Sequence, residues 1–134
     1  MNIVLDTNVL VSAILSPHGP PAAALRTLLT GRGRLCFDER ILSEYRTVLS
    51  RDKFAFDQAL VEELLGFLEG AGVSILTEPL DLALPDPEDQ MFIEVAVSSK
   101  AEFLVTGNLK HFPKLLRQGI AVVSPREFLD AVLS

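Results

Sequence analysis

The sequence predicts a single α/β domain with a central, mostly parallel sheet of five strands. Five short apolar runs alternate with longer segments of helical periodicity, which is the order found in parallel α/β domains. The first run, Ile3-Val4-Leu5, is unbroken and ends at Asp6, as expected of a strand buried on both faces. The chain has 134 residues, so we expect residues 1–134 to form one domain.

Start signals mark the expected helices. Asp6-Thr7-Asn8 can cap a helix that follows the first strand, and Pro20-Pro21 can open the next helix. Asp86-Pro87 is a strong helix start, and Ser124-Pro125-Arg126-Glu127 is a capping box. We expect helices over residues 9–13, 22–29, 41–49, 56–70, 91–99 and 128–133, and strands over residues 3–5, 34–37, 73–76, 103–106 and 120–123.

Composition excludes several classes of protein. Hydrophobic residues make up 49% of the chain and charged residues 22%, a balance that excludes disordered and low-complexity proteins. The single cysteine excludes an intramolecular disulfide and a metal site built from cysteines. The apolar runs are too short to span a membrane, and the first lacks the basic region of a signal peptide. We therefore expect a soluble cytoplasmic protein.

The net charge of -6 conceals an uneven distribution along the chain. Residues 26–53 contain seven basic side chains and four acidic ones, whereas residues 54–99 contain ten acidic side chains and no basic one. Residues 100–134 contain five basic and three acidic side chains, and Lys110, His111, Lys114 and Arg117 form a basic run. Two interpretations remain open: solvated helix faces, or an acidic metal site with basic rims that hold a polyanion.

Several polar residues are expected at one edge of the sheet. Asp6 ends the first strand, Asp86 and Asp89 open the helix after the third, and Thr106-Gly107-Asn108 ends the fourth. The carboxyl ends of parallel strands share an edge, where ligands bind in such sheets. Glu44, at about 100° per residue, lies roughly 40° from Val48, at the border of its helix's apolar face, and can reach this edge.

Each of these residues also has an ordinary structural interpretation when it is taken alone. Asp6 and Asp86 are good helix caps, and Asp89 suits the first turn of a helix because of the helix dipole. Glu44 fits a boundary position, and Asn108 a turn. The convergence of several carboxylates is what points to a cation, and an all-oxygen set suits Mg²⁺ or Mn²⁺. The chain has two histidines, so a zinc site is not expected.

Four motifs, in order, resemble those of the PIN-domain family. They are residues 4–13 (VLDTNVLVSA), Ser43-Glu44 in a helix, residues 86–92 (DPEDQMF) and residues 104–108 (LVTGN). Residues 124–129 (SPREFL) are also similar to that family's C-terminal end, so that the resemblance spans nearly the whole chain. It is closest to the stand-alone prokaryotic members described as toxins of toxin–antitoxin pairs, such as VapC-like proteins.

The resemblance implies a three-layer PIN-like fold and an Mg²⁺- or Mn²⁺-dependent ribonuclease that prefers single-stranded RNA. The family's catalytic acidic set then corresponds to Asp6, Glu44 and Asp89, with Asp86 nearby. The family often has a further aspartate where this chain has Asn108, a neutral oxygen donor, and this departure makes two-metal chemistry doubtful. The metal set implied here is Asp6, Asp89, Glu44, Asp86 and Asn108, and the substrate-binding set is Asn8, Thr106, Arg46 and Lys110.

Other functions fit the sequence less well. An aspartyl-phosphate phosphohydrolase needs a second acid two residues after the first, where this chain has Asn8. A receiver domain needs an acid pair and a late lysine that are not arranged here. The stronger alternative is a catalytically weakened PIN-like module that binds RNA or protein. The feature that favours it is Asn108, which stands where the family often has an aspartate.

The resemblance also implies partners. PIN-domain toxins typically form dimers and are silenced by an antitoxin that inserts a segment near the active site. Two amphipathic helices, expected over residues 22–29 and 56–68, can present an apolar face to such a partner. Alternatively, both helices only cover the sheet.

Overall fold

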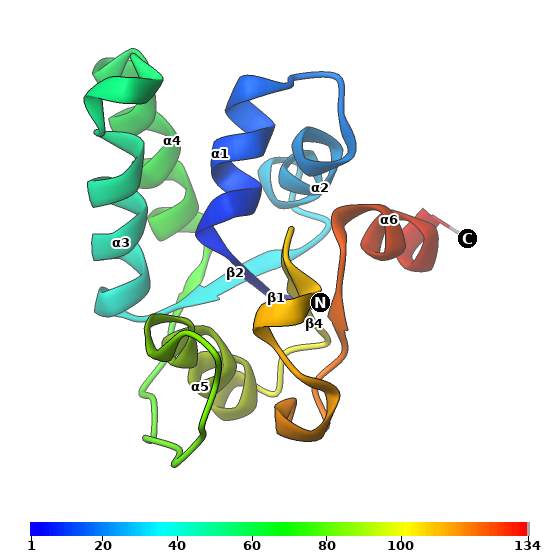
Figure 1. Ribbon diagram of the computed structural model, residues 1–134. Coiled ribbons are helices and arrows are strands. Elements are labelled where there is room, and N and C mark those ends of the chain that lie inside the picture. The colour runs from blue at the N-terminus through cyan, green and yellow to red at the C-terminus, as the bar shows by residue number, and fades with distance from the viewer. Residues whose placement is uncertain (134) are drawn as a thin grey trace.

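The computed structural model describes residues 1–133 and contains a five-stranded sheet in the order β3-β2-β1-β4-β5 (Figure 1). Every pair of neighbouring strands is parallel, which confirms the predicted fold class. The strands are β1 (Asn2–Leu5), β2 (Arg34–Phe37), β3 (Val73–Ser74), β4 (Phe103–Val105) and β5 (Val122–Val123).

The strand order reverses between β1 and β4. From β1 the chain proceeds outward to β2 and β3, then returns to form β4 on the other side of β1 and continues to β5. Leu5 pairs with Val105 at the carboxyl ends of the two central strands, and Asp6 N donates to Val105 O at 2.9 Å. This reversal is a topological switch point, where parallel α/β sheets open a crevice for ligands.

Helices cover both faces of the sheet, which gives three layers (Figure 1). Helices α1 to α4 lie on one side and α5 on the other, while α6 packs against α2, β4 and β5. Among residues 1–133, no helix is both long and apolar enough to cross a membrane. The helices are α1 (Thr7–Leu15), α2 (Pro20–Leu29), α3 (Glu39–Leu49), α4 (Gln58–Ala71), α5 (Gln90–Ser99) and α6 (Pro125–Leu133). Four short 3-10 turns are η1 (Asp52–Phe54), η2 (Pro87–Asp89), η3 (Leu109–His111) and η4 (Lys114–Leu116).

Burial explains why the central strands are so apolar. Ile3 and Val4 are fully buried because helices cover both faces of β1. Tyr45 of α3 is also fully buried, and its hydroxyl donates to the carbonyl oxygen of Leu5 at the end of β1. The apolar face of α5 contributes Phe92 and Ile93 to the same core. The carboxyl end of β1 is therefore fixed by packing and by hydrogen bonds.

Several predicted boundaries differ from the structure for identifiable reasons. β3 ends at Ser74 instead of Leu76, because only Cys36 and Phe37 of β2 are available to pair with it, and Leu76 is 95% exposed. α4 begins at Gln58 instead of Phe56, because the Asp57 carboxylate accepts from Ala59 N and Leu60 N and caps the helix there.

Further differences lie near the C-terminus. β5 is restricted to Val122–Val123, the residues that pair with β4. α6 begins at Pro125, three residues earlier than expected. The predicted capping box is confirmed, since Ser124 N donates to Glu127 Oε1 at 2.9 Å and Glu127 N donates to Ser124 Oγ at 3.1 Å.

Candidate active site

Asp6 follows β1 and occupies the N-cap position of α1, but its side chain caps no N–H group in the part of the chain that the structure describes. The residue is 5% exposed. Its Oδ2 accepts a hydrogen bond of 2.8 Å from Thr106 Oγ1 and a longer one of 3.5 Å from Asn8 Nδ2. Asp6 therefore occupies the predicted N-cap position without the usual side-chain capping hydrogen bond. Its carboxylate is directed across to the end of β4.

Thr106 and Asn8 join the ends of the two central strands. The Thr106 hydroxyl donates to Asp6 and accepts from Asn108 N at 3.0 Å, while Asn8 Oδ1 accepts from Gly107 N at 2.9 Å. A Cβ atom at Gly107 would lie 3.2 Å from Asn8 Oδ1, so the close approach favours glycine. These contacts orient the Asp6 carboxylate.

Glu44 lies on α3, half-buried at the boundary position that its helical phase predicts. Its Oε2 accepts a hydrogen bond from Thr7 Oγ1 in the first turn of α1. The Glu44 charge is close enough to Asp6 to influence its ionisation. Burial raises the pKa of Asp6, the hydrogen bond from Thr106 opposes that rise, and the Glu44 carboxylate adds to it.

Asp89 ends the turn η2 that precedes α5, and it is 8% exposed. Its Oδ2 atom lies 2.9 Å from His111 Nδ1 but accepts no well-aligned hydrogen bond from any described residue. Burial raises the pKa of Asp89 to about 6, the negative charge of Asp6 contributes to the rise, and His111 opposes it. Asp6 is thus electrostatically coupled to both Glu44 and Asp89.

The remaining predicted residues lie in different surroundings. Asp86 Oδ1 accepts from Glu88 N at 2.9 Å, so it is a cap, although its charge also raises the pKa of Asp89. Asn108 is half-buried beside Thr106, and Lys110 is exposed on η3. Arg46 is turned toward α4, where its Nε lies 3.3 Å from Glu62 Oε1.

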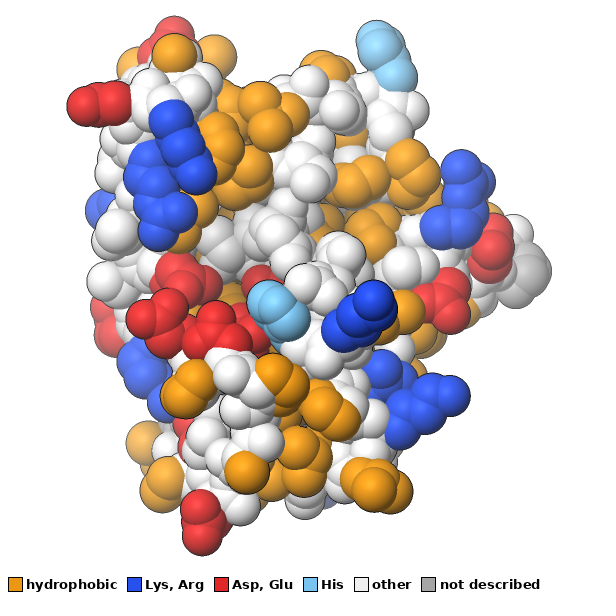
Figure 2. Space-filling model, in the orientation of Figure 1, with side chains coloured by type: hydrophobic (Ala, Val, Ile, Leu, Met, Phe, Trp, Pro, Cys, Tyr) orange, Lys and Arg blue, Asp and Glu red, His pale blue; other side chains and the backbone are white. Residues whose placement is uncertain are grey.

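The surface around the acidic residues is hollowed and mixed in charge. A groove of about 590 Å³ runs between α3 and the start of α5, with Glu44, Glu88 and Arg40 among the residues that line it. Figure 2 shows acidic side chains gathered near the centre of this face, a histidine at their border, and basic side chains to both sides. Acidic and basic side chains therefore lie next to one another on this face of the molecule.

Sequence reasoning missed His111 and the pair Arg40 and Glu94. His111 was noted only within a basic run, and its contact with Asp89 depends on how η3 folds back over the sheet edge. Glu94 stands in an apolar stretch of α5 and is 3% exposed. A carboxylate in such a stretch signals a buried charge that needs a partner, which the structure shows to be Arg40.

The carboxylate oxygens of Asp6, Glu44 and Asp89 are the type of ligand that a hard divalent cation prefers. They lie in a partly enclosed, negatively charged region. Asp89 Oδ2 is buried and lacks a well-aligned donor, as expected of a ligand atom. Within residues 1–133, however, no three His, Cys, Asp or Glu side chains are arranged to hold a metal ion as they stand. Glu44 Oε2 accepts a hydrogen bond from Thr7, and Asp89 Oδ2 lies 2.9 Å from His111 Nδ1.

Fold and site together define a small, all-parallel α/β domain with coupled carboxylates at the switch point of its sheet. The chain belongs to the PIN-domain family, since that family's model matches residues 2–110. This confirms the resemblance seen in the sequence. A comparison with curated proteins finds no match.

Solved structures with the same fold include proteins from two named bacteria. VapBC2 from Rickettsia felis, bound to a DNA fragment from its promoter, contains a chain that is 18% identical, with a TM-score of 0.62 and coverage of 92% of this chain and 98% of that one. FitAcB from Neisseria gonorrhoeae gives 20% identity, a TM-score of 0.59 and the same coverage. FitAB bound to an IR36 DNA fragment is similar, with 20% identity, a TM-score of 0.58 and coverage of 92% and 94%. At these identities the comparison establishes the fold.

Proposed function

We propose that this chain is a metal-dependent ribonuclease that hydrolyses phosphodiester bonds of single-stranded RNA, and that it is the toxin of a toxin–antitoxin pair. The observation that carries the proposal is the state of Asp6. This buried carboxylate lies at the switch point, is oriented by Thr106, and is coupled in charge to Glu44 and Asp89. Membership of the PIN-domain family supports a nuclease.

Asp6, Asp89 and Glu44 would hold Mg²⁺ or Mn²⁺, with Asp86 and Asn108 at the margin of the site. Such an ion supplies activation of water and neutralises charge on the phosphate. Because Asn108 contributes no charge, one ion suits this site better than two.

The other side chains have supporting roles in this proposal. Thr106 is fully buried, so we assign it to orienting Asp6, and Asn8 to holding the turn at Gly107. Lys110 is exposed and would contact a phosphate on one side of the scissile bond. Arg46 would contact a phosphate on the other side by exchanging its exposed ion pair with Glu62 for the phosphate. The positions of these two residues say nothing about sequence preference, and the scarcity of aromatic side chains limits stacking.

A protein partner is supported by the surface and by the similar structures. Leu15 on α1 and Leu60 and Phe67 on α4 are 56%, 62% and 47% exposed, so an apolar surface is open beside α4. Two of the three similar structures are complexes bound to DNA. We infer an antitoxin partner with a DNA-binding part, a homodimer of this chain, and a cytoplasmic location.

The test is cleavage of varied single-stranded RNAs by freshly purified, partner-free protein. We expect cleavage with Mg²⁺ or Mn²⁺, none with EDTA, and none in Asp6→Asn or Asp89→Asn. Asp130→Asn, which changes an exposed aspartate of α6, is the matched control and should cleave normally. The alternative, a weakened module that binds RNA or protein, is favoured by Asn108. It predicts RNA binding without cleavage, equal in wild type and Asp6→Asn, and that result would overturn the nuclease proposal.

A further inference from the structure

Two of the three site carboxylates, Glu44 and Asp89, lie on or beside different helices. The distance between them therefore depends on how α3 and α5 are held relative to each other. Glu44 is on α3, and Asp89 immediately precedes α5. The groove of about 590 Å³ opens between these two helices alongside Glu44. A polar contact that crosses this groove joins α3 to α5 and can therefore influence the distance between Glu44 and Asp89.

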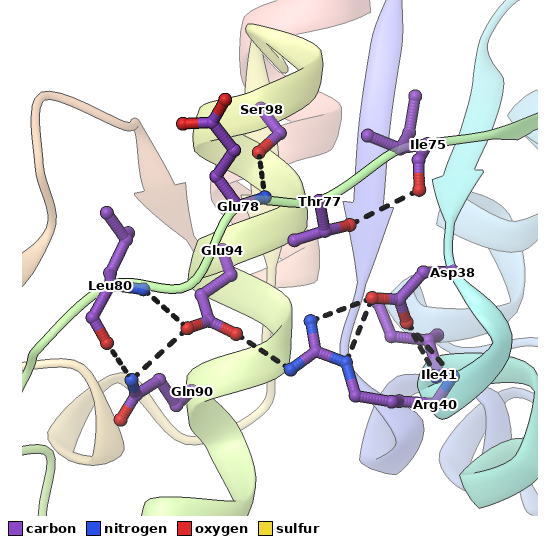
Figure 3. A network of polar contacts seen from close by, with 10 residues as sticks. All are labelled: Asp38, Arg40, Ile41, Ile75, Thr77, Glu78, Leu80, Gln90, Glu94 and Ser98. Carbon is purple, nitrogen blue, oxygen red and sulfur yellow. Dashed lines mark hydrogen bonds and ion pairs between the residues drawn. The ribbon is translucent and has the colours of Figure 1, made fainter.

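Arg40 makes such a contact from the α3 side (Figure 3). Its Nη1 donates to Glu94 Oε1 of α5 at 2.7 Å. Its Nε and Nη2 both donate to Asp38 Oδ2, at 2.9 and 2.7 Å, so the guanidinium is held in one orientation. Arg40 also precedes Glu44 by one helical turn, which places both side chains on the same face of α3.

Glu94 is anchored just as firmly on the α5 side. The residue is 3% exposed, and its Oε2 accepts from Leu80 N at 2.7 Å and from Gln90 Nε2 at 3.2 Å. The Gln90 side chain also donates to the carbonyl oxygen of Leu80, as Figure 3 shows. Gln90 is the residue after Asp89, so the same network fixes the start of α5.

The carboxylate of Glu94 is buried, whereas the Arg40 side chain that pairs with it is 48% exposed. An ion pair with one partner this exposed is screened by solvent and adds little to the free energy of unfolding. The location of the pair is more informative, because Arg40 lies one turn from Glu44 and Glu94 lies one turn from the start of α5.

We propose that Arg40 and Glu94 are positioning residues that set the spacing between Glu44 and Asp89 and, through it, the affinity of the acidic site for a divalent cation. This inference rests on the proposed function, in which those carboxylates hold the ion. Neither Arg40 nor Glu94 needs to touch the ion or the RNA.

The test compares Mn²⁺ affinity, measured from free Mn²⁺ by EPR titration, with the melting temperature in EDTA. Arg40→Met removes the bridge and leaves the buried Glu94 charge unpaired, so both quantities should fall. The double variant Arg40→Met/Glu94→Gln removes the unpaired charge and keeps an acceptor for Leu80 N. Its melting temperature should recover, while its Mn²⁺ affinity should stay roughly tenfold or more below wild type, the loss typical of disturbed support around metal ligands.

Two further variants complete the experiment. Arg40→Lys keeps a cation within reach of Glu94 and should restore part of the affinity. Glu62→Gln breaks the exposed ion pair between α3 and α4 and should leave Mn²⁺ affinity unchanged. Recovery of affinity together with melting temperature in the double variant would show a merely structural pair and overturn the positioning role alone. Absence of Mn²⁺ binding by wild type would overturn the proposed function and the positioning role with it.

Discussion

The Thr106 hydroxyl donates a 2.8 Å hydrogen bond to Oδ2 of Asp6, although the two residues lie 100 positions apart in the chain. The parallel pairing of β1 with β4 brings them together, because each residue directly follows its strand. The bond stabilises the ionised form of a carboxylate that burial would otherwise favour as the neutral acid. The pKa of Asp6 remains raised, so the hydrogen bond from Thr106 offsets part of the effect of burial.

Replacing Thr106 by valine should weaken both the fold and the site. The Asn108 N–H loses its acceptor and Asp6 loses its donor, so we expect a loss of about 1–3 kcal/mol in the free energy of unfolding. Thr106→Ser keeps the hydroxyl and should preserve Mn²⁺ affinity, whereas Thr106→Val should lower it. Denaturant unfolding and Mn²⁺ titration measure the two effects. Equal Mn²⁺ affinities in the two variants would contradict the role given to the hydroxyl.

Asp89 should make the metal-free protein less stable as the pH rises. Its pKa is about 6 in the folded protein against an ordinary value of 3.8, so folding favours its protonated form. The contribution of protonated Asp89 to the free energy of unfolding is complete below about pH 3.8, and it is lost as the pH rises through about 6. Asp89→Asn cannot ionise, so its stability relative to wild type in EDTA should increase between pH 4 and pH 7. A stability difference that stays constant over this range would be inconsistent with a raised pKa.

Replacing Asn108 by aspartate should tighten metal binding. An anionic oxygen then replaces a neutral one at the end of β4, close to Thr106 and Asp6. Cleavage at low metal concentration should be maintained or increased. The measurement is an Mn²⁺ titration of the variant and of wild type, and weaker binding by Asn108→Asp would place that side chain away from the ion.

The sequence was sufficient for the sheet and for most of its helices, because apolar runs and caps are local signals. It was insufficient for the length of β3, since the apolar run through Leu76 does not reveal the register in which β3 pairs only with Cys36 and Phe37, the last two residues of β2. Phe56 likewise looks helical until Asp57 is recognised as the cap. Errors of this kind arise where pairing or capping, and not hydrophobicity, decides where an element ends.

The site shows the same division. The position of Asp6 at a strand end is readable from the sequence, but a cap and a ligand have the same local signature. Only the contact with Thr106 distinguishes them. His111 beside Asp89, and Arg40 beside Glu94, are pairs of residues distant in sequence, and their contacts depend on the packing of η3 and of α3 with α5.

The central claim is that Asp6 is held as a metal ligand, and a melting experiment on wild type and Asp6→Asn tests it most directly. Each protein is melted with EDTA and with Mn²⁺ at constant ionic strength. In EDTA, Asp6→Asn should melt at or above wild type, because the substitution removes repulsion with Glu44 and Asp89 and no cap is lost.

With Mn²⁺ at ten times its dissociation constant, wild type should gain about 1.4 kcal/mol, a shift of several degrees in melting temperature. Asp6→Asn should lose most of that response. If Asp6→Asn instead melts well below wild type in EDTA and neither protein responds to Mn²⁺, Asp6 is a structural residue and the metal site proposed here is wrong.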